Sequence, residues 1–476
     1  MVINKKKVFV LGLDSIPPEL LFDRWLNQLP NIKRLISEGL YGGLESTIPA
    51  ITCPAWPSMM TSANPGRLGL YGFRNRSNYN YDGLCFASSK TIKIDTVWDI
   101  LSRIGKKVVL IGIPMTYPPQ PVNGCMVTCF MTPDTKSQYT YPAGLKAEVE
   151  SITNGYILDV DEFRSEKKEY ILKKIYDMTE KRFKLTKKYI HSKEWDFFMM
   201  VEMGPDRIHH AFWKYFDETH PKHPSGSEYK DAILNYYKYL DKEIGETLAL
   251  LDENTMVLIV SDHGSKKMVG GICINEWLIQ NGYMKLVEYP KTTTPFNKLM
   301  VDWKNTSVWG EGGYYGRVFL NVQGREPHGV IPKHNYENFR NELIRKLEDL
   351  RDENGNNINT KVFKPEEIYS ECAGVPPDLI VYYGNLDWRS IGSVGSGSIW
   401  ADENDTGPDD ANHSQHGIFI LKKMGIWAAS ERMALPSTMF LRRFYNIWTL
   451  KYLKIWKDGL LHNQCHSIGF FRGVFG

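Results

Sequence analysis

KVFVLGLD, at residues 7–14, is the segment from which the fold can be inferred. The run from Val8 to Leu13 is apolar throughout and ends at Asp14. A strand that is apolar on both faces is typical of a parallel sheet covered by helices on its two sides. Functional residues collect where such strands end, so Asp14 is the first candidate for a functional side chain.

The same pattern, an apolar strand followed by a polar residue, recurs at 108–114, 195–202 and 256–262. Helical patterns lie between the predicted strands, at 30–39, 54–63, 95–104, 163–193 and 228–251. Strands that alternate with helices predict an α/β fold, here a doubly wound, mostly parallel sheet flanked by helices.

The regular alternation of strand and helix patterns ends after residue 265, and this change predicts an insertion. Residues 266–412 contain strand-like RVFLNV (317–322) and DLIVYY (378–383), a helical pattern at 335–352, and a stretch rich in Gly, Ser, Asp and Asn at 384–412 that predicts a long loop or lid. The apolar GIFIL at 417–421 then predicts a return to the core. We therefore predict a catalytic core of residues 1–265 and 413–435, an inserted α+β substrate-specificity region of residues 266–412, and a tail of residues 436–476.

The composition excludes several classes of protein. The chain has 476 residues, and 58 Lys and Arg against 55 Asp and Glu give a net charge of +3, so no overall field favours nucleic acid. Seven cysteines without a CxxC pair fit neither a disulfide framework nor a thiolate zinc site. No apolar run approaches the ~18 residues of a membrane span. We expect a cytoplasmic protein.

Short polar motifs supply candidate metal ligands. In GPDRIHH, Asp206 and His210 are four residues apart, so on a helix both side chains would share one face and could hold one metal ion. In SDHG, Asp262 and His263 can converge only if the chain turns, and the glycine that follows permits a turn. NHSQHGI adds His413.

Each motif also has an ordinary structural interpretation. An aspartate after a strand, such as Asp14, often forms a turn, and an i,i+4 Asp/His pair is often a solvated helix face. Thr52, in TCPAW, resembles a helix N-cap with Pro54 in the first turn. His209 and His416 are further histidines that a structural role explains better.

The motifs in this order resemble those of the alkaline phosphatase superfamily, and within it the type I phosphodiesterase/nucleotide pyrophosphatase branch. The resemblance is carried by LGLDSIPPELL, LPNIKRLISEG, STIPAITCPAWPSMMTSANPGRLGLYGF, GPDRIHHAFWKYFD, VLIVSDHG and NHSQHGIFIL, which span most of residues 7–421. It implies a parallel sheet between helices and two divalent metal ions, usually zinc, at the carboxyl ends of the strands.

The resemblance also implies a role for each candidate ligand. One metal ion goes to Asp14, Asp262 and His263 with Thr52 as the bridging nucleophile, and the other goes to Asp206, His210 and His413. His413 is chosen over His416 because the family's histidine lies four residues before a strand-opening glycine, here Gly417. A divalent ion would lower the pKa of the Thr52 hydroxyl, so that no histidine base is required. His and Asp ligands without a thiolate suit zinc or manganese.

Substrate contacts are predicted at four positions. The helix that starts near Thr52 would direct the backbone N–H of Cys53 at a phosphoryl oxygen. The branch has an asparagine about twenty residues after the nucleophile, but the equivalent position here is Phe73, so Arg74 or Asn75 would take its place. NVQGRE also recurs in the branch, and its Arg325 would either face the substrate or form a structural salt bridge.

The tail of residues 436–476 has the pattern of a basic amphipathic helix. Aromatic and aliphatic residues from Phe444 to Trp456 fall on one arc, and lysines and arginines fall on the other. Such a helix could lie on an anionic membrane and bring the enzyme to a lipid-linked phosphodiester. Its aromatic face could equally pack on the catalytic core or on a second subunit, as in a homo-oligomer.

Together these features predict a two-metal phosphodiesterase or pyrophosphatase that acts on a small-molecule or lipid-linked diester through a phospho-Thr52 intermediate. The alternatives are a metal-dependent phosphomonoesterase or phosphomutase, which usually carries a serine nucleophile, and a catalytically inactive binding protein of the same fold. A sulfatase needs an arginine at the position of Pro57 and is disfavoured.

Overall fold

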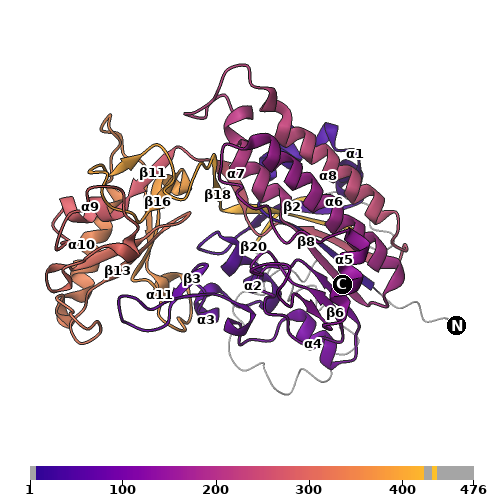
Figure 1. The fold of residues 1–476 in the computed structure, drawn as a ribbon, viewed down its shortest axis with the longest axis horizontal. Helices are drawn as coiled ribbons and strands as arrows, with labels where there is room; N and C mark the ends of the chain where they lie inside the picture. Colours follow the sequence, from indigo (N-terminus) through magenta and orange to yellow (C-terminus); the bar gives the residue numbers. More distant parts are fainter. Residues whose placement is uncertain (1–6, 423–430, 437–476) are drawn as a thin grey trace.

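The computed structural model describes residues 7–422 and 431–436 and is built on a nine-stranded sheet (Figure 1). The spatial order of the strands is β20-β2-β19-β9-β1-β8-β5-β6-β7. Their bounds are β1 (Lys7–Leu13), β2 (Gly39–Glu45), β5 (Val108–Ile111), β6 (Gly124–Val127), β7 (Thr140–Tyr141), β8 (Phe197–Glu202), β9 (Thr255–Val260), β19 (His416–Lys422) and β20 (Glu431–Pro436). The predicted mostly parallel sheet is confirmed.

The centre of the sheet is parallel and its margins are mixed. β9, β1, β8, β5 and β6 pair in parallel, whereas β19 runs antiparallel to both β9 and β2. The start of β19 therefore lies at the same edge as the ends of β1, β8, β9 and β2. Polar residues that follow the parallel strands, or that precede β19, are brought together at this edge.

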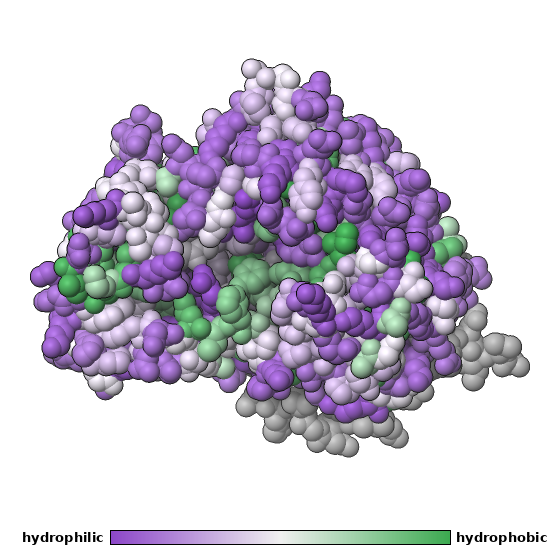
Figure 2. Space-filling model, viewed as in Figure 1, coloured by the Kyte–Doolittle hydropathy of each residue, from purple (hydrophilic) through white to green (hydrophobic). Residues whose placement is uncertain are grey.

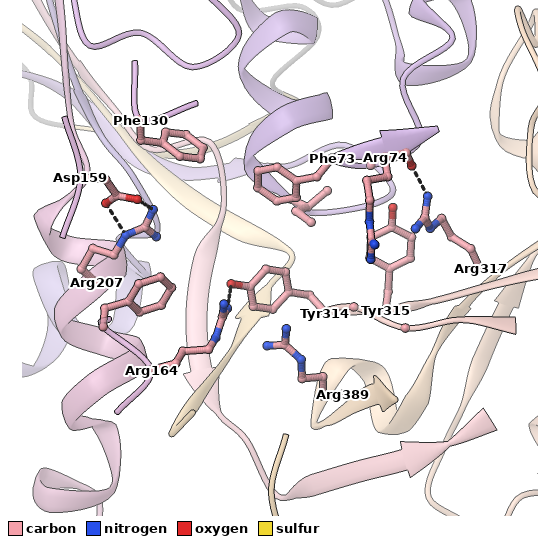
Figure 3. A pocket seen from close by; sticks show the side chains of 15 residues that line it. Phe73, Arg74, Phe130, Asp159, Arg164, Arg207, Tyr314, Tyr315, Arg317 and Arg389 are labelled. Carbon is pink, nitrogen blue, oxygen red and sulfur yellow. Dashed lines mark hydrogen bonds and ion pairs between the residues drawn. The ribbon is translucent and has the colours of Figure 1, made fainter. Parts of the chain in front are cut away.

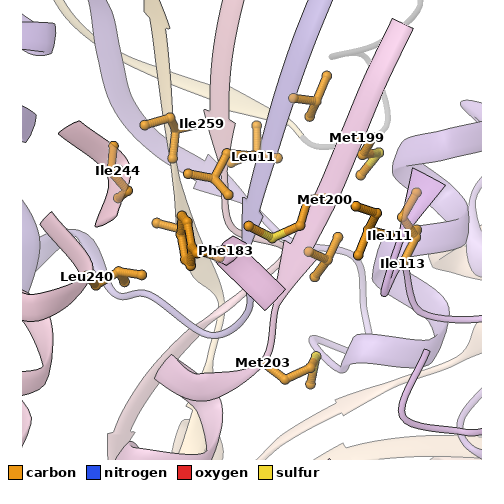
Figure 4. Packing of buried hydrophobic residues seen from close by; sticks show 14 of the residues in the cluster. Leu11, Ile111, Ile113, Phe183, Met199, Met200, Met203, Leu240, Ile244 and Ile259 are labelled. Carbon is orange, nitrogen blue, oxygen red and sulfur yellow. The ribbon is translucent and has the colours of Figure 1, made fainter. Parts of the chain in front are cut away.

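Helices cover both faces of the sheet, as its apolar strands require. They are α1 (Pro30–Ser37), α2 (Thr52–Thr61), α3 (Pro65–Leu68), α4 (Val97–Arg103), α5 (Leu145–Thr153), α6 (Lys168–Ser192), α7 (Gly204–Phe216) and α8 (Ala232–Leu248). Phe183 of α6 and Ile244 of α8 lie on the side of the sheet where Leu11 and Ile259 project (Figure 4). Trp56 of α2 approaches Gly12 of β1, and both residues belong to the buried interior of the protein.

The region between β9 and β19 forms a separate lobe with its own hydrophobic cluster, which includes Ile274, Leu320 and Leu343 (Figure 1). Its elements are β11 (Gly270–Cys273), α9 (Ile274–Gln280), β12 (Val308–Glu311), β13 (Gly316–Leu320), α10 (Tyr336–Glu348), β14 (Lys361–Phe363), α11 (Pro365–Ile368), β15 (Leu379–Tyr382), β16 (Trp388–Ile391) and β17 (Trp400–Ala401). A ribbon of β10 (Gly264–Lys267) and β18 (Ala411–Ser414) joins it to the core. The hairpin of β3 (Arg74–Arg76) and β4 (Leu84–Phe86) precedes the insertion in the sequence but contacts the inserted lobe, where Arg76 pairs with Glu326. The surface is hollowed between the two lobes (Figure 2).

One segment is more ordered than its composition indicates. Residues 384–412 were expected to form a long loop or lid, but they contain β16, β17 and the start of β18. β16 and β17 both pair with β11, which precedes them by more than a hundred residues, so tertiary pairing overrides the local loop signal.

The remaining expectations concern membrane spans, the C-terminal tail and the domain boundaries. No helix within the described part of the chain is long and apolar enough to cross a membrane. The predicted amphipathic helix lies in residues 437–476, outside the described residues, and the exact domain boundaries remain predictions.

The contact between β1 and α2 predicts that Gly12 cannot be enlarged without cost. A Cβ at Gly12 would lie 2.4 Å from Trp56 Cη2 and 2.7 Å from Val201 Cγ2. Overpacking of this kind should lower the free energy of unfolding of Gly12→Ala by about 1–3 kcal/mol, measured by urea denaturation.

The matched control is Gly144→Ala. Gly144 has a φ of −63° and open space around its Cβ position, so this change should be neutral to within about 0.5 kcal/mol. Equal urea midpoints for the two variants would contradict the tight packing of α2 on β1.

Candidate active site

The first cluster of candidate ligands forms where β1 and β9 end. Asp14 follows β1, and Asp262 and His263 follow β9, the neighbouring parallel strand. His263 Nε2 lies 3.6 Å from Asp14 Oδ1 and 3.3 Å from Asp262 Oδ2, and all three side chains are fully buried. The chain turns after Asp262 as expected, so that both polar side chains reach the same place.

The second cluster combines α7 with β18. Asp206 and His210 share one face of α7, as their spacing predicts, with His210 Nε2 3.3 Å from Asp206 Oδ1. His413 arrives from β18, and its Nε2 lies 3.6 Å from Asp206 Oδ1 and 3.4 Å from His210 Nε2. The side chains of both clusters have the residue types and spacing that could hold one metal ion each.

Each imidazole of the two clusters is oriented by a partner on its far side. The Nδ1–H of His263 donates to the carbonyl of Gly264, and that of His413 donates to the carbonyl of Ala50, at 3.0 and 3.1 Å. His210 Nδ1 lies 2.6 Å from Asp409 Oδ1. For His263 and His413 these contacts place the proton on Nδ1 and leave Nε2 with a lone pair that faces the cluster. At His210 burial acts to lower the pKa, but the charges of Asp409 and Asp206 outweigh it and raise the pKa well above the usual range, so a bound cation would have to displace the proton of Nε2.

Thr52 lies between the clusters at the start of α2. Its Oγ1 is 3.2 Å from His263 Nε2 and 3.5 Å from Asp14 Oδ1. The N-cap is the extended Ile51 rather than Thr52, so the threonine hydroxyl does not cap the helix. Among the described residues, the backbone N–H of Cys53 has no hydrogen-bond partner, and at a helix N-terminus it can donate to an anion.

Burial perturbs the carboxylates of the site strongly. It raises the pKa of Asp14 to about 8 and that of Asp262 well above its usual range, and repulsion from neighbouring carboxylates adds to both shifts. For Asp206 burial also acts upward, but the positive charges of His210 and Arg207 outweigh it and hold the pKa well below the usual range. The site as a whole is therefore short of positive charge.

The site residues fit divalent cations. Asp206 Oδ1 and Asp262 Oδ2 are buried and have no hydrogen-bond partner, one in each cluster. Burial also lowers the pKa of His263 to about 4, which leaves its Nε2 unprotonated near neutral pH. Orphaned carboxylate oxygens beside neutral imidazoles are the donor set that zinc or manganese binds.

A cavity of about 330 Å³ opens beside the clusters, between the core and the inserted lobe (Figure 3). Ile51 lines it next to Thr52, and Tyr314 stacks on the ring of His413 with 3.8 Å between centroids. Five arginines and several aromatic side chains complete the wall; the arginines are Arg74, Arg164, Arg207, Arg317 and Arg389.

The four predicted substrate contacts are placed differently. Cys53 and Arg74 lie at the site, the first through its backbone N–H and the second in the cavity wall. The amide of Asn75 is occupied by its own turn, accepting from Tyr71 N and donating to Gly72 O. Arg325 is not among the residues that line the cavity and forms ion pairs with Asp378 and Glu326, which is the structural salt bridge considered as its alternative.

The two spare histidines have no place in the clusters. Both ring nitrogens of His209 are engaged, with Ser265 Oγ and Tyr237 Oη, and His416 is exposed at the start of β19. The geometry thus separates His210 and His413 from their neighbours, in agreement with the choice made from spacing.

Sequence reasoning missed several residues that support the site. Trp56 Nε1 donates to Asp14 Oδ2 at 2.7 Å, and Asp409 binds His210. Trp56 lies four residues after Thr52 and therefore on the same helix face, a spacing that could have revealed it. Nothing in the local sequence distinguishes Asp409 from the other acids of its segment.

Such a sheet, with two buried Asp/His clusters that could each hold a metal ion and a threonine at a helix N-terminus, has the architecture of an alkaline-phosphatase-like hydrolase. The chain belongs to the type I phosphodiesterase/nucleotide pyrophosphatase family, whose model matches residues 8–418. It is accordingly a hydrolase that acts on phosphoric ester bonds, and the family is typically dependent on two metal ions.

Solved structures agree on the fold. Human ectonucleotide pyrophosphatase/phosphodiesterase 5 aligns with a TM-score of 0.54 and 12% identity over 93% of this chain and 95% of that one. An inactive variant of the murine protein in complex with AMP gives a TM-score of 0.53 at 12% identity, over 93% and 94% of the two chains. No curated protein sequence matches this chain.

The contact between Trp56 and Asp14 predicts a measurable effect on metal binding. Trp56→Phe keeps the packing but removes the indole N–H that orients the carboxylate. Loss of such a supporting hydrogen bond should weaken Zn²⁺ affinity by about 10–100-fold, measured by competition with a chromophoric chelator.

Trp213→Phe is the matched control. The indole of Trp213 also donates to a carboxylate, that of Asp217, which belongs to neither cluster. Its zinc affinity should equal that of the unmodified protein, and equal affinity in Trp56→Phe would show that Asp14 needs no orienting donor.

Proposed function

We propose that the protein is a two-metal phosphodiesterase or pyrophosphatase that forms a phosphothreonine intermediate at Thr52. The observation that carries this proposal is the position of Thr52 Oγ1, within 3.2–3.5 Å of a histidine and an aspartate of one cluster and at the N-terminus of α2. A hydroxyl in this place is set to attack a phosphorus atom whose oxygens face the helix.

Asp14, Asp262 and His263 would hold one cation, and Asp206, His210 and His413 the other. When bound, the ions would lower the pKa of the Thr52 hydroxyl and neutralise charge on the phosphoryl oxygens. The donor set favours zinc, with manganese as the alternative.

The residues of the chain then define the order of bond changes. Thr52 Oγ1 forms a bond to phosphorus while the bond from phosphorus to the leaving oxygen breaks, and the N–H of Cys53 donates to a phosphoryl oxygen. The leaving group ends as an alcohol or phosphate that carries the proton given up by Thr52. Water next attacks phosphorus, which breaks the Oγ1–P bond and restores the threonine.

The AMP complex of the murine neighbour supports a nucleotide-containing diester or pyrophosphate as substrate. The rival is a phosphomonoesterase or phosphomutase, because basic residues around a terminal phosphate are typical of those enzymes. The arginines of the cavity are the observation in its favour.

Thr52→Ala tests the proposed nucleophile. On zinc-loaded protein, hydrolysis of bis-p-nitrophenyl phosphate should exceed that of p-nitrophenyl phosphate, and Thr52→Ala should reduce diester turnover by at least about 10³-fold, since no other positioned hydroxyl replaces Oγ1. Thr52→Ser, which keeps a hydroxyl, is the matched control and should retain measurable turnover. A monoester preference would favour the rival, and turnover independent of Thr52 would refute the intermediate.

Metal content tests the two-cluster assignment. The zinc-loaded protein should contain two ions per chain, whereas Asp262→Ala and Asp206→Ala should each lose one, because each change removes a carboxylate from a different cluster. Elemental analysis after gel filtration measures the ratio. Asp217→Ala, remote from both clusters, should keep two ions, and loss of both ions in either cluster variant would mean that the sites are not independent.

A further inference from the structure

The cavity beside the clusters carries more positive charge than its own acids neutralise. Its wall contains five arginines, and Asp159 is the only carboxylate among the residues that line it. Arg207 is fully engaged, since it binds both oxygens of Asp159 at 2.7 Å and also contacts Asp206. The other four arginines therefore decide the charge of the cavity.

Two of these four share a single acid behind the wall. Arg164 and Arg389 both bind Asp409 Oδ2, at 2.9 and 2.8 Å, and His210 approaches the other oxygen of the same carboxylate. Asp409 is fully buried, and the Arg389 side chain is only 8% exposed. One negative charge thus serves two guanidinium groups and an imidazole.

The remaining two arginines form no ion pair within the described residues. Arg317 donates to the backbone carbonyl of Arg74. The guanidinium of Arg74 is exposed at the rim and forms no hydrogen bond with the described part of the chain. Glu311 is a buried acid that attracts both arginines electrostatically, although burial is the larger effect and raises its pKa. Figure 3 shows Arg74 beside Tyr315 on one wall, and Arg164 and Arg389 beside Tyr314 on the other.

The position of these arginines relative to the clusters suggests what they bind. Tyr314 stacks on His413, Arg389 lies over the outer face of Tyr314 at 4.4 Å, and Arg164 donates to the Tyr314 hydroxyl. Arg164 and Arg389 thus contact the aromatic ring that stacks on the candidate ligand His413. The scissile phosphoryl group is expected at Thr52 and the helix N-terminus, so these arginines face a different part of the substrate.

We propose that this arginine pocket binds a second anionic group, a carboxylate or a phosphate, carried by the substrate in addition to its scissile phosphodiester. Guanidinium groups bind such anions through paired, charge-assisted hydrogen bonds. The proposal rests on the proposed function, because it identifies the substrate of the same site. It makes the enzyme selective for diesters with an acidic substituent over neutral ones.

Three matched probes test the proposal: the p-nitrophenyl phosphate diesters of phenol, 4-carboxyphenol and 4-phosphonophenol. They share the scissile centre and differ in one anionic group. Dissociation constants are measured by calorimetry on zinc-loaded Thr52→Ala protein, which should bind without turnover. At least one anionic probe should bind about tenfold or more tightly than the phenyl probe, and the better of the two identifies the anion.

Single arginine substitutions in the Thr52→Ala protein test which residues cause the preference for an anionic probe. Arg74→Gln and Arg389→Gln should each reduce, at least threefold, the ratio of the affinity for the better anionic probe to the affinity for the phenyl probe. Arg345→Gln, which changes an exposed arginine of α10, is the control and should leave this ratio unchanged. Arg74 is not one of the arginines that bind Asp409, so its variant leaves the ion pairs of Asp409 unchanged. Equal affinities for the three probes, or a preference that survives both changes, would overturn the proposal.

These measurements distinguish a failure of the proposed anion pocket from a failure of the proposed reaction. If the proposed function fails, protein with Thr52 intact will hydrolyse none of the probes, yet the affinity ratio can still be measured. If only the pocket is misassigned, hydrolysis will proceed without discrimination among the three diesters.

Discussion

Three carboxylates, those of Asp14, Asp206 and Asp262, are buried together at one edge of the central sheet, and this arrangement requires compensating positive charge. Two of their oxygens are buried without a hydrogen-bond partner among the described residues, and the repulsion among the acids grows as the surroundings lose polarity. Divalent cations would resolve this conflict, so the electrostatic cost built into the fold would also be the source of an affinity for metal. The parallel strands, α7 and the ribbon β10–β18 all serve to hold these acids in place.

The inserted lobe is connected to this centre through few but specific contacts. Asn412 of β18 donates to the carbonyls of Tyr314 and Leu386, and Asp409 links a histidine of the centre to two arginines of the cavity. Two arginines of the cavity and the candidate ligand His210 therefore share the same carboxylate. A change in one is expected to affect the other, because Asp409 cannot reorient toward an arginine without changing its contact with His210.

Much of the core could be predicted from the sequence, because buried parallel strands and an i,i+4 ligand pair leave strong local signals. The strand pattern of residues 7–14, repeated in alternation with helical patterns, predicted the sheet, and the spacing of Asp206 and His210 predicted their shared helix face. The strands within 384–412 could not be predicted, since their pairing partner β11 is distant in the sequence. For the same reason the positions of the Asn75 and Arg325 side chains could not be predicted. Whether a polar side chain faces a substrate, its own turn or an ion-pair partner depends on neighbours that no local pattern reveals.

The strand order has a consequence for folding while the protein is being synthesised on the ribosome. β19 lies between β2 and β9, although it is made long after both. Asp14, Asp262 and His263 can meet once about the first half of the chain has emerged, whereas the cluster of Asp206 and His210 must wait for His413. During synthesis β2 has no neighbour on either side, and the edge of β9 stays open until β19 arrives. Nascent chains of intermediate length thus present unpaired strand edges, the feature by which chaperones and aggregation partners recognise unfinished proteins.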